Sequence, residues 1–219
     1  MGAPLIILQV LEFVACVTGL IYWRKIRTSV FKWFPAYLGF IVISECVGQM
    51  LNKPGMENAN HAFFNYFEIP VEFLFFFWLF YITGKDNKYK ALPLVCAGLY
   101  LLCWLTDTLY LSKMHFSFYS FSYTMGNLLL LVLIMRYFIL LVTSNHILGF
   151  RNDMLFWICT GLLLYYLGTF PYYGLINTFG ILYPKLYSGY SLVMYALNSL
   201  MYLMFTFSFI WGRPSTKSL

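Results

Sequence analysis

The stretch over residues 61–84, HAFFNYFEIPVEFLFFFWLFYITG, constrains the fold more than any other part of the sequence. It exceeds the about 20 helical residues that cross about 30 Å of hydrocarbon, yet its first half carries two carboxylates and Pro70. A helix aligns four of its polar residues on one face, at offsets 0, 4, 7 and 11: His61, Asn65, Glu68 and Glu72. Because an ionisable group at membrane depth costs roughly 2.5 to 3.5 kcal/mol, this face is expected to meet protein or water and not lipid.

The whole chain has the composition of an integral membrane protein. Of its 219 residues, 61% are hydrophobic, 22% aromatic and only 10% charged, which lies outside the range of soluble domains. Apolar runs leave no room for a soluble catalytic or DNA-binding domain. The predicted fold is an all-α bundle of seven membrane spans, a single transmembrane domain over residues 1–219. The expected helices are about 4–23, 33–52, 62–84, 91–109, 120–143, 154–178 and 186–211.

The basic residues predict the orientation of the bundle. Ten of the 14 lysines and arginines fall in the connections on one side: Arg24, Lys25, Arg27, Lys32, Lys85, Lys88, Lys90, Arg151, Arg213 and Lys217. Three fall on the other: Lys53, Lys113 and Lys185. Since cytoplasmic loops carry the excess of cations, we expect the N-terminus outside and the C-terminus in the cytoplasm. No basic region precedes the first apolar segment, which we therefore interpret as a permanent span and not as a cleaved signal peptide.

The net charge of +6 does not indicate nucleic-acid binding, because the cations lie in short loops as topology determinants. The expected partners are the lipid bilayer and either a protein at the basic cytoplasmic loops or a second copy of the chain. The five cysteines fall within predicted helices without a C-x-x-C pair, and we interpret them as packing residues.

A layer of acids and amides is predicted in the outer half of the membrane, since a rise of 1.5 Å per residue places them about 9 to 15 Å deep. Four carboxylates at one level cannot all be ionised without several kcal/mol of repulsion and desolvation. Some must be protonated, paired or bound to a cation. The candidate ligand-binding residues are Glu68, Glu72, Asn65, Glu12, Glu45, Gln49, Asn127, Tyr195 and Asn198. The alternative is that these groups only join helices, at about 0.6 to 2 kcal/mol each.

Three features modify this layer. Arg136, the only cation at membrane depth, is expected nearer the cytoplasm than the acids and is a candidate ion-pair partner for Glu72. Glu68 and Glu72 could act as an acid/base pair or bind a divalent cation with His61, and His61 with Glu68 is the weak candidate for a metal site. Two acids four residues apart are by themselves an unspecific signal. Pro70 removes one backbone hydrogen bond and lets its helix bend.

The last two expected helices suggest further contacts. Pro171 is expected to interrupt helix 154–178, and Gly161 and Gly168, seven residues apart, indicate a close helix contact.

Several chemistries are excluded by position or by missing motifs. The three histidines lie at opposite membrane edges, which excludes a three-histidine zinc site or a haem between helices. Residues 186–211 contain no lysine for a retinal Schiff base. The sequence also lacks the G-x-S-G, G-x-G-D and D-x-x-x-D motifs, and no cofactor is expected.

Two short motifs carry a resemblance to a known group. One is F-N-Y-F-E at residues 64–68 with a second glutamate four residues later. The other is F-W-I-x-x-G-x-L-x-Y-x-x-G from Phe156 to Gly168. Together they resemble a group of uncharacterised multi-spanning proteins of Bacteroidota. The resemblance implies a multi-pass protein of the bacterial inner membrane and brings no catalytic residues with it.

The leading hypothesis is a sensor or accessory protein that binds a small or lipid-like ligand, or protons, in an outward-facing polar cavity and signals to a partner. A transporter or oligomeric pore, including a membrane effector of a defence system, is the first alternative. An intramembrane lipid-modifying enzyme that uses the same carboxylates is the second. The sequence favours a non-enzymatic role.

Overall fold

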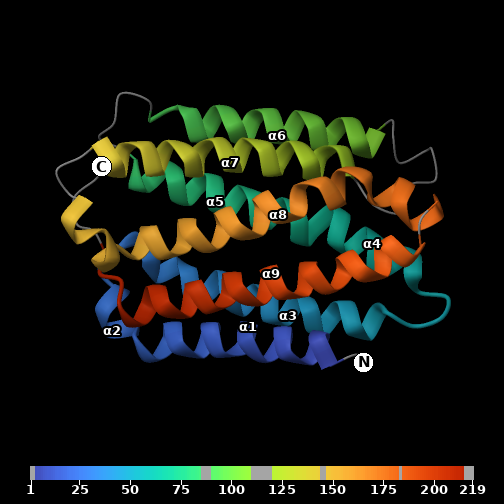
Figure 1. The fold of residues 1–219 in the computed structure, drawn as a ribbon, viewed down its shortest axis with the longest axis horizontal. Coiled ribbons are helices and arrows are strands. Elements are labelled where there is room, and N and C mark those ends of the chain that lie inside the picture. Colours follow the sequence, from blue (N-terminus) through green and yellow to red (C-terminus); the bar gives the residue numbers. More distant parts are fainter. Residues whose placement is uncertain (1–2, 85–89, 110–119, 144–146, 183, 215–219) are drawn as a thin grey trace.

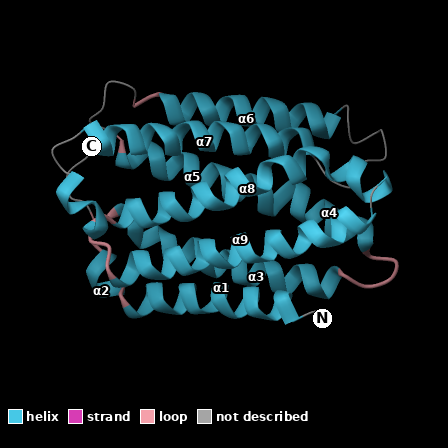
Figure 2. Cartoon of the chain, in the orientation of Figure 1, coloured by secondary structure: helices cyan, strands magenta, loops and turns pink. Residues whose placement is uncertain are grey.

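The regular structure of the chain is helical in all the parts that can be described. The computed structural model describes residues 3–84, 90–109, 120–143, 147–182 and 184–214, and each regular element in these ranges is a helix (Figures 1 and 2). A helix satisfies its own backbone N–H and C=O groups, as an apolar environment requires. The elements are α1 Ala3–Ile21, α2 Trp23–Ile26, η1 Val30–Lys32, α3 Trp33–Leu51, α4 Glu57–Phe63, η2 Phe64–Glu68, α5 Ile69–Thr83, α6 Leu92–Leu109, α7 Ser120–Thr143, η4 Ile147–Asn152, α8 Met154–Leu182 and α9 Pro184–Ile210.

Within the described ranges, six helices are long and apolar enough, by length and composition, to cross a membrane, so the protein is a multi-pass helical membrane protein. These spans are Pro4–Ile21, Val30–Leu51, Asn58–Thr83, Leu92–Leu109, Phe121–Thr143 and Gly189–Ile210. In α8 the segment Met154–Phe170 is apolar but shorter. The helix bounds differ from the expected ones by a few residues. The predicted interruption at Pro171 is wrong, because α8 continues through this residue to Leu182.

The long helices form a closed ring. α1 packs on α3 and α9, α9 packs on α8, and α8 packs on α7. α7 packs on α5 and α6. α4, η2 and α5 form one continuous rod, and the contact of η2 with α3 closes the ring. α6 lies outside this ring against α5 and α7, at the edge of the bundle in Figure 1. Side chains that α1, α3, η2, α5, α8 and α9 turn inward therefore share one interior.

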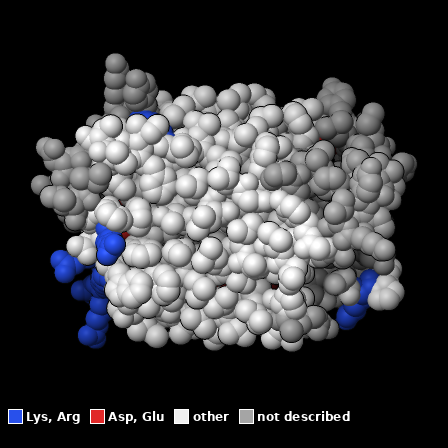
Figure 3. Space-filling model, viewed as in Figure 1, with Lys and Arg blue, Asp and Glu red and all other residues white. Residues whose placement is uncertain are grey.

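The two ends of the bundle differ in charge. At one end of the bundle, basic residues lie around α2 and where the C-terminal end of α9 meets the N-terminal end of α8. We call this the basic end, and its residues are Arg24, Lys25, Arg27, Lys32, Arg151 and Arg213. On the face drawn in Figure 3, Lys and Arg lie toward the ends and the side of the bundle is almost free of charge. Trp23, Trp33 and Trp211 are exposed near the basic end, where tryptophans of membrane proteins meet the lipid headgroups.

Aromatic rings fill the interior near the basic end. The ring of Phe34 lies 5.0 Å from that of Phe205 and 5.6 Å from that of Phe209. Tyr37 stacks on Phe75 at 4.2 Å between centroids. These rings pack closely in the interior between α3, α5 and α9 in this half of the bundle.

Candidate functional site

The rod α4–η2–α5 contains a π-turn where the polar residues are concentrated. Pro70 has no N–H and its ring crowds the carbonyl four residues before it. In η2 the chain adopts the wider turn, and the N–H of Ile69 bonds to the carbonyl of Phe64, five residues back. This releases the Asn65 carbonyl, which accepts the indole N–H of Trp104 from α6 at 3.0 Å. π-turns inside helices are frequent at functional sites.

The π-turn corrects the predicted face of four aligned polar residues. A wider turn holds one extra residue, which rotates the residues before it by about 100° relative to those after it. Asn65 and Glu68 are buried, at 5% and 8% exposed, whereas His61 is exposed in α4. His61 therefore does not share the face of Glu68. Within the described ranges, no three His, Cys, Asp or Glu side chains come together as metal ligands.

Four carboxyl groups interact inside the ring. Glu12 of α1 lies in electrostatic contact with Glu45 of α3. Glu68 of η2 interacts with Glu45, with Glu12 and with Glu72 of α5. Glu12 is only 3% exposed, and one buried oxygen of Glu68 has no hydrogen-bond partner among the described residues. Like charges that interact in a poorly solvated interior repel each other, which disfavours ionisation of all four groups at once.

Tyrosines from three helices surround these acids. The Tyr166 hydroxyl of α8 donates to Glu72 Oε1 at 2.7 Å, and the Tyr202 hydroxyl of α9 donates to Glu12. Tyr37 of α3 interacts with Glu72, Glu68 and Glu12 and is 6% exposed. Sequence reasoning assigned none of the three as partners of the acids. For Tyr37 a signal existed, because it belongs to the buried stripe of α3 that recurs every three or four residues, and a buried tyrosine needs a polar partner.

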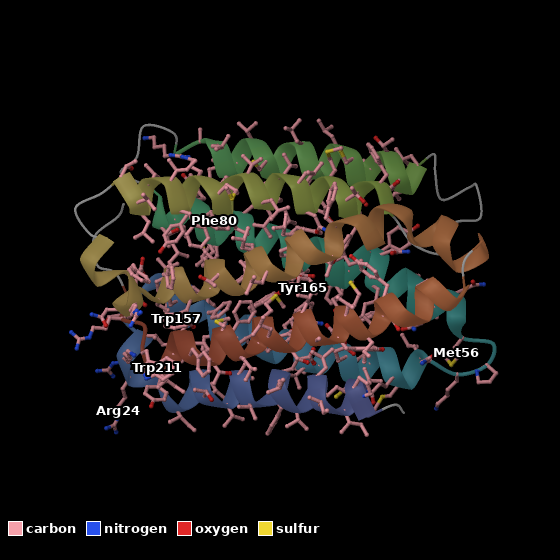
Figure 4. All side chains as sticks on the ribbon, in the orientation of Figure 1. Arg24, Met56, Phe80, Trp157, Tyr165 and Trp211 are labelled. Atoms are coloured by element: carbon pink, nitrogen blue, oxygen red, sulfur yellow. The ribbon has the colours of Figure 1, made fainter. Side chains whose placement is uncertain are left out.

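A cavity of about 390 Å³ lies next to the acids, at the end of the bundle opposite the basic end. We call it the Glu45 cavity and this end the cavity end. Its walls come from α1, α3, α4, η2, α8 and α9: Leu5, Leu8, Glu45, Gly48, Gln49, Asn52, Asn60, Phe64, Tyr165, Ser191, Met194, Tyr195 and Asn198. Tyr165, labelled in Figure 4, lies near the middle of the bundle. Asn52 is exposed, so the cavity reaches the surface.

The wall residues of α3 and α9 follow the same helical pattern. On α3 and the residue that follows it they fall at offsets 0, 3, 4 and 7: Glu45, Gly48, Gln49 and Asn52. On α9 they fall at the same offsets: Ser191, Met194, Tyr195 and Asn198. Each set is one face of a helix, so two opposed faces form most of the cavity.

The predicted site residues are thus divided by the structure. Glu45, Gln49, Tyr195 and Asn198 line the cavity. Glu12, Glu68, Glu72 and Asn65 do not line it; the three acids interact with Glu45 directly or through Glu68, and Asn65 belongs to the π-turn.

Asn127 lies apart from the cavity. It is 0% exposed on α7, beside Gly126, whose Cα faces the ring of Phe73. Neither amide atom of Asn127 has a hydrogen-bond partner in the described part of the chain.

Arg136 lies toward the basic end. It borders a small cavity of about 50 Å³ together with Phe80, Thr83 and Lys90. Phe80 and Thr83 follow Glu72 on α5 by roughly 12 and 17 Å at 1.5 Å per residue. Arg136 is therefore closer to the basic end than to the four acids, and its ion pair with Glu72 stays a prediction.

The basic end is a tightly connected junction. Lys25 Nζ donates to the carbonyls of Phe209 and Ile210 at 2.8 and 3.1 Å, at the C-terminal end of α9. Burial, and then the charge of Arg213, lower the pKa of Lys25 from its usual value.

Arg213 joins the end of α9 to the start of α8. The Arg213 N–H donates to Asn152 O at 2.6 Å, and the Met154 N–H donates to Arg213 O at 3.1 Å. Backbone contacts from both neighbours therefore hold the turn after α9 in place.

Asp153 caps the N-terminus of α8 in this junction. Its carboxylate accepts the Leu155 N–H at 3.0 Å and the Tyr137 hydroxyl at 2.8 Å. Burial raises the pKa of Asp153 above its usual value, and the two hydrogen bonds partly offset that rise.

No protein-family model, curated protein or solved structure matches this chain. The chemistry of the cavity and of the acids beside it is therefore the basis for a functional interpretation.

Proposed function

We propose that this protein is a seven-span receptor of the bacterial inner membrane that binds a small polar ligand in the Glu45 cavity. The observation that carries the proposal is the cavity itself. About 390 Å³ of space reaches the surface and is lined by a carboxylate, four amide side chains and two tyrosines. Small-molecule sites have this form, a preformed concave space with a few convergent polar groups. Polar side chains that only join helices do not require such a space.

The charge distribution supports an outward-facing cavity. Among the described residues, six lysines and arginines make up the basic end, whereas Lys53 lies near the cavity end in the connection after α3. By the rule that cytoplasmic loops hold the excess of cations, the basic end faces the cytoplasm. The N-terminus and the cavity then face the outside, and α8 supplies the seventh span.

Helix α9 supports a signalling role, because it connects the two ends. Its first half contributes Ser191, Met194, Tyr195 and Asn198 to the cavity, and its last carbonyls are held by Lys25. A ligand that shifts α9 therefore changes the junction at the basic end. A cytoplasmic protein that reads this junction is the proposed partner.

Proton-coupled transport is the second candidate function. It is favoured by the succession of carboxylates from Glu45 at the cavity through Glu68 to Glu72. Against it stands the aromatic packing of Phe34, Phe205 and Phe209 toward the basic end, which favours a receptor. Proton flux through proteoliposomes that disappears in Glu72→Gln would establish transport, and its absence would remove this candidate.

A binding screen on the purified protein tests the receptor proposal. Organic cations, neutral polyols and organic anions are added to the protein in detergent, and the unfolding temperature is followed with ligand concentration. At least one class is expected to stabilise the protein saturably, by the linkage between binding and folding.

Two adjacent substitutions locate the binding. Ser191→Phe fills the cavity and is expected to abolish the stabilisation, whereas Leu192→Phe, at a position 60% exposed on the outer face of α9, is expected to preserve it. Saturable binding by no class, or equal binding to both variants, would refute the receptor proposal.

A further inference from the structure

The hydrogen-bonding groups of the Glu45 cavity indicate which ligand chemistry it accepts. Among its described wall residues, two buried polar atoms have no hydrogen-bond partner, Asn60 Oδ1 and Asn198 Oδ1. Both are oxygens, and an amide oxygen only accepts hydrogen bonds. Glu45 adds a carboxylate, which is also an acceptor when ionised. These two amide oxygens and the carboxylate therefore favour a ligand that donates hydrogen bonds.

The charge of the surroundings indicates the same class of ligand. Glu45 is in electrostatic contact with Glu12 and Glu68, and within the described residues no lysine or arginine lines the cavity. An anion would add to the repulsion among these carboxyl groups, whereas a cation relieves it. Tyr165 and Tyr195 present aromatic rings in the walls, and such rings attract cations.

The rest of the wall is apolar. Leu5, Leu8, Phe64 and Met194 complete the lining, so the cavity accommodates a short hydrocarbon body next to its polar groups. A fully hydrated inorganic cation makes no favourable contact with these apolar side chains.

We infer that the Glu45 cavity binds the protonated form of a primary aliphatic amine, with its ammonium group at Glu45, Asn60 and Asn198. The inference rests on the proposed receptor function and names the class of its ligand. A primary ammonium has three N–H donors and no acceptor, one donor for each of these three acceptors. A quaternary ammonium has the same charge but no N–H, and it leaves the amide oxygens unpaired.

Four probes with the same six-carbon chain separate charge from hydrogen bonding. They are hexylammonium, hexyltrimethylammonium, 1-hexanol and hexanoate, each titrated into the purified 219-residue chain in detergent by calorimetry. Hexylammonium is expected to bind saturably and more tightly than the other three. Equal or tighter binding of the quaternary probe would overturn the assignment of the two amide oxygens.

Substitutions place the ammonium at Glu45. Glu45→Gln keeps the shape and removes the charge, and it is expected to weaken hexylammonium binding on the order of tenfold or more, as for a hydrogen bond to a charged group. Asp153→Asn removes a carboxylate at the other end and is expected to leave the affinity unchanged. Unchanged affinity in Glu45→Gln would refute the inference. If Glu45→Gln does not fold, Asn198→Leu is tested in its place. Unchanged affinity for hexylammonium in Asn198→Leu would likewise refute the inference.

The outcomes distinguish this inference from the function on which it rests. Hexanol or hexanoate binding that is lost in Ser191→Phe and kept in Glu45→Gln would overturn the amine assignment and leave the receptor intact. If neither these probes nor any class in the broader screen binds saturably, both proposals fail.

Discussion

Tyr166 and Tyr100 allow the contribution of the Glu72 hydrogen bond to be measured against a matched control. Both side chains are 0% exposed, and Tyr→Phe removes one hydroxyl from each. The Tyr166 hydroxyl donates to Glu72 Oε1 at 2.7 Å, whereas the Tyr100 hydroxyl has no partner among the described residues. Any difference between the two variants therefore reports the hydrogen bond and not burial of the ring.

The expected magnitudes follow from these contacts. Tyr166→Phe leaves a buried acceptor without its donor, which costs about 1 to 3 kcal/mol. Tyr100→Phe removes a buried hydroxyl that makes no bond, and since such a hydroxyl is itself unfavourable by about 1 to 3 kcal/mol, the variant is expected to be neutral or more stable. The free energies of unfolding should differ by at least about 1 kcal/mol.

Unfolding in mixed detergent and dodecyl sulfate measures these free energies, and a double-mutant cycle with Glu72→Gln isolates the pair. A coupling of about 0.6 to 1.7 kcal/mol is typical of a neutral pair inside a membrane protein. About 1.5 to 3 kcal/mol is expected when the acceptor is ionised. Coupling near zero, or an equal loss in Tyr100→Phe, would show that Glu72 is not held by Tyr166.

Three further substitutions test the packing and the basic end. Lys25→Met removes two bonds to the carbonyls at the end of α9 and is expected to cost about 0.3 to 2 kcal/mol, whereas exposed Arg24→Met should stay within about 0.5 kcal/mol in the same unfolding assay. Because the folded pKa of Asp153 is above its usual 3.8, its contribution to stability is largest below that pH. The contribution is lost as the pH rises through the folded pKa. The stability of the protein relative to Asp153→Asn should therefore decrease across that range, and an increase in the pH titration would contradict the assignment. Gly161→Ala brings a Cβ within 3.0 to 3.4 Å of α9, including its backbone, and is expected to lose about 1 to 3 kcal/mol by overpacking. Gly98→Ala, with nothing within 4 Å, should lose nothing, and an equal loss at both would refute the contact.

Features that depend on one helix at a time could be predicted from the sequence. Six of the seven expected spans follow from apolar length, and the level of Glu12, Glu45 and Glu68 follows from counting residues. A close helix contact at Gly161 and Gly168 was also expected, and it is confirmed: a Cβ at either glycine would meet side chains of α9 at 3.0 Å or less. That α9 is the partner was not predicted.

Features that depend on how helices rotate against each other could not be predicted. Pro70 is compatible with a bend or with a π-turn, and only the π-turn turns His61 outward while Asn65 stays buried. The cavity lies between the faces of α3 and α9, so Glu45 lines it and Glu72 does not. Nothing in either sequence segment alone specifies that pairing.

The tyrosine partners of the acids could not be predicted from the sequence either. The chain has 19 tyrosines, and helical periodicity places many of them on interior faces. Which of them reaches an acid depends on contacts between distant segments, as for Tyr166 and Glu72, 94 residues apart.

The most direct measurement of the central claim is an experimental density map of the protein with hexylammonium bound. The account predicts density for the probe in the space lined by Leu5, Glu45 and Asn198, with its nitrogen about 3 Å from the Glu45 carboxylate. Density for the probe outside this space, or a space occupied in the same way in Glu45→Gln, would contradict it.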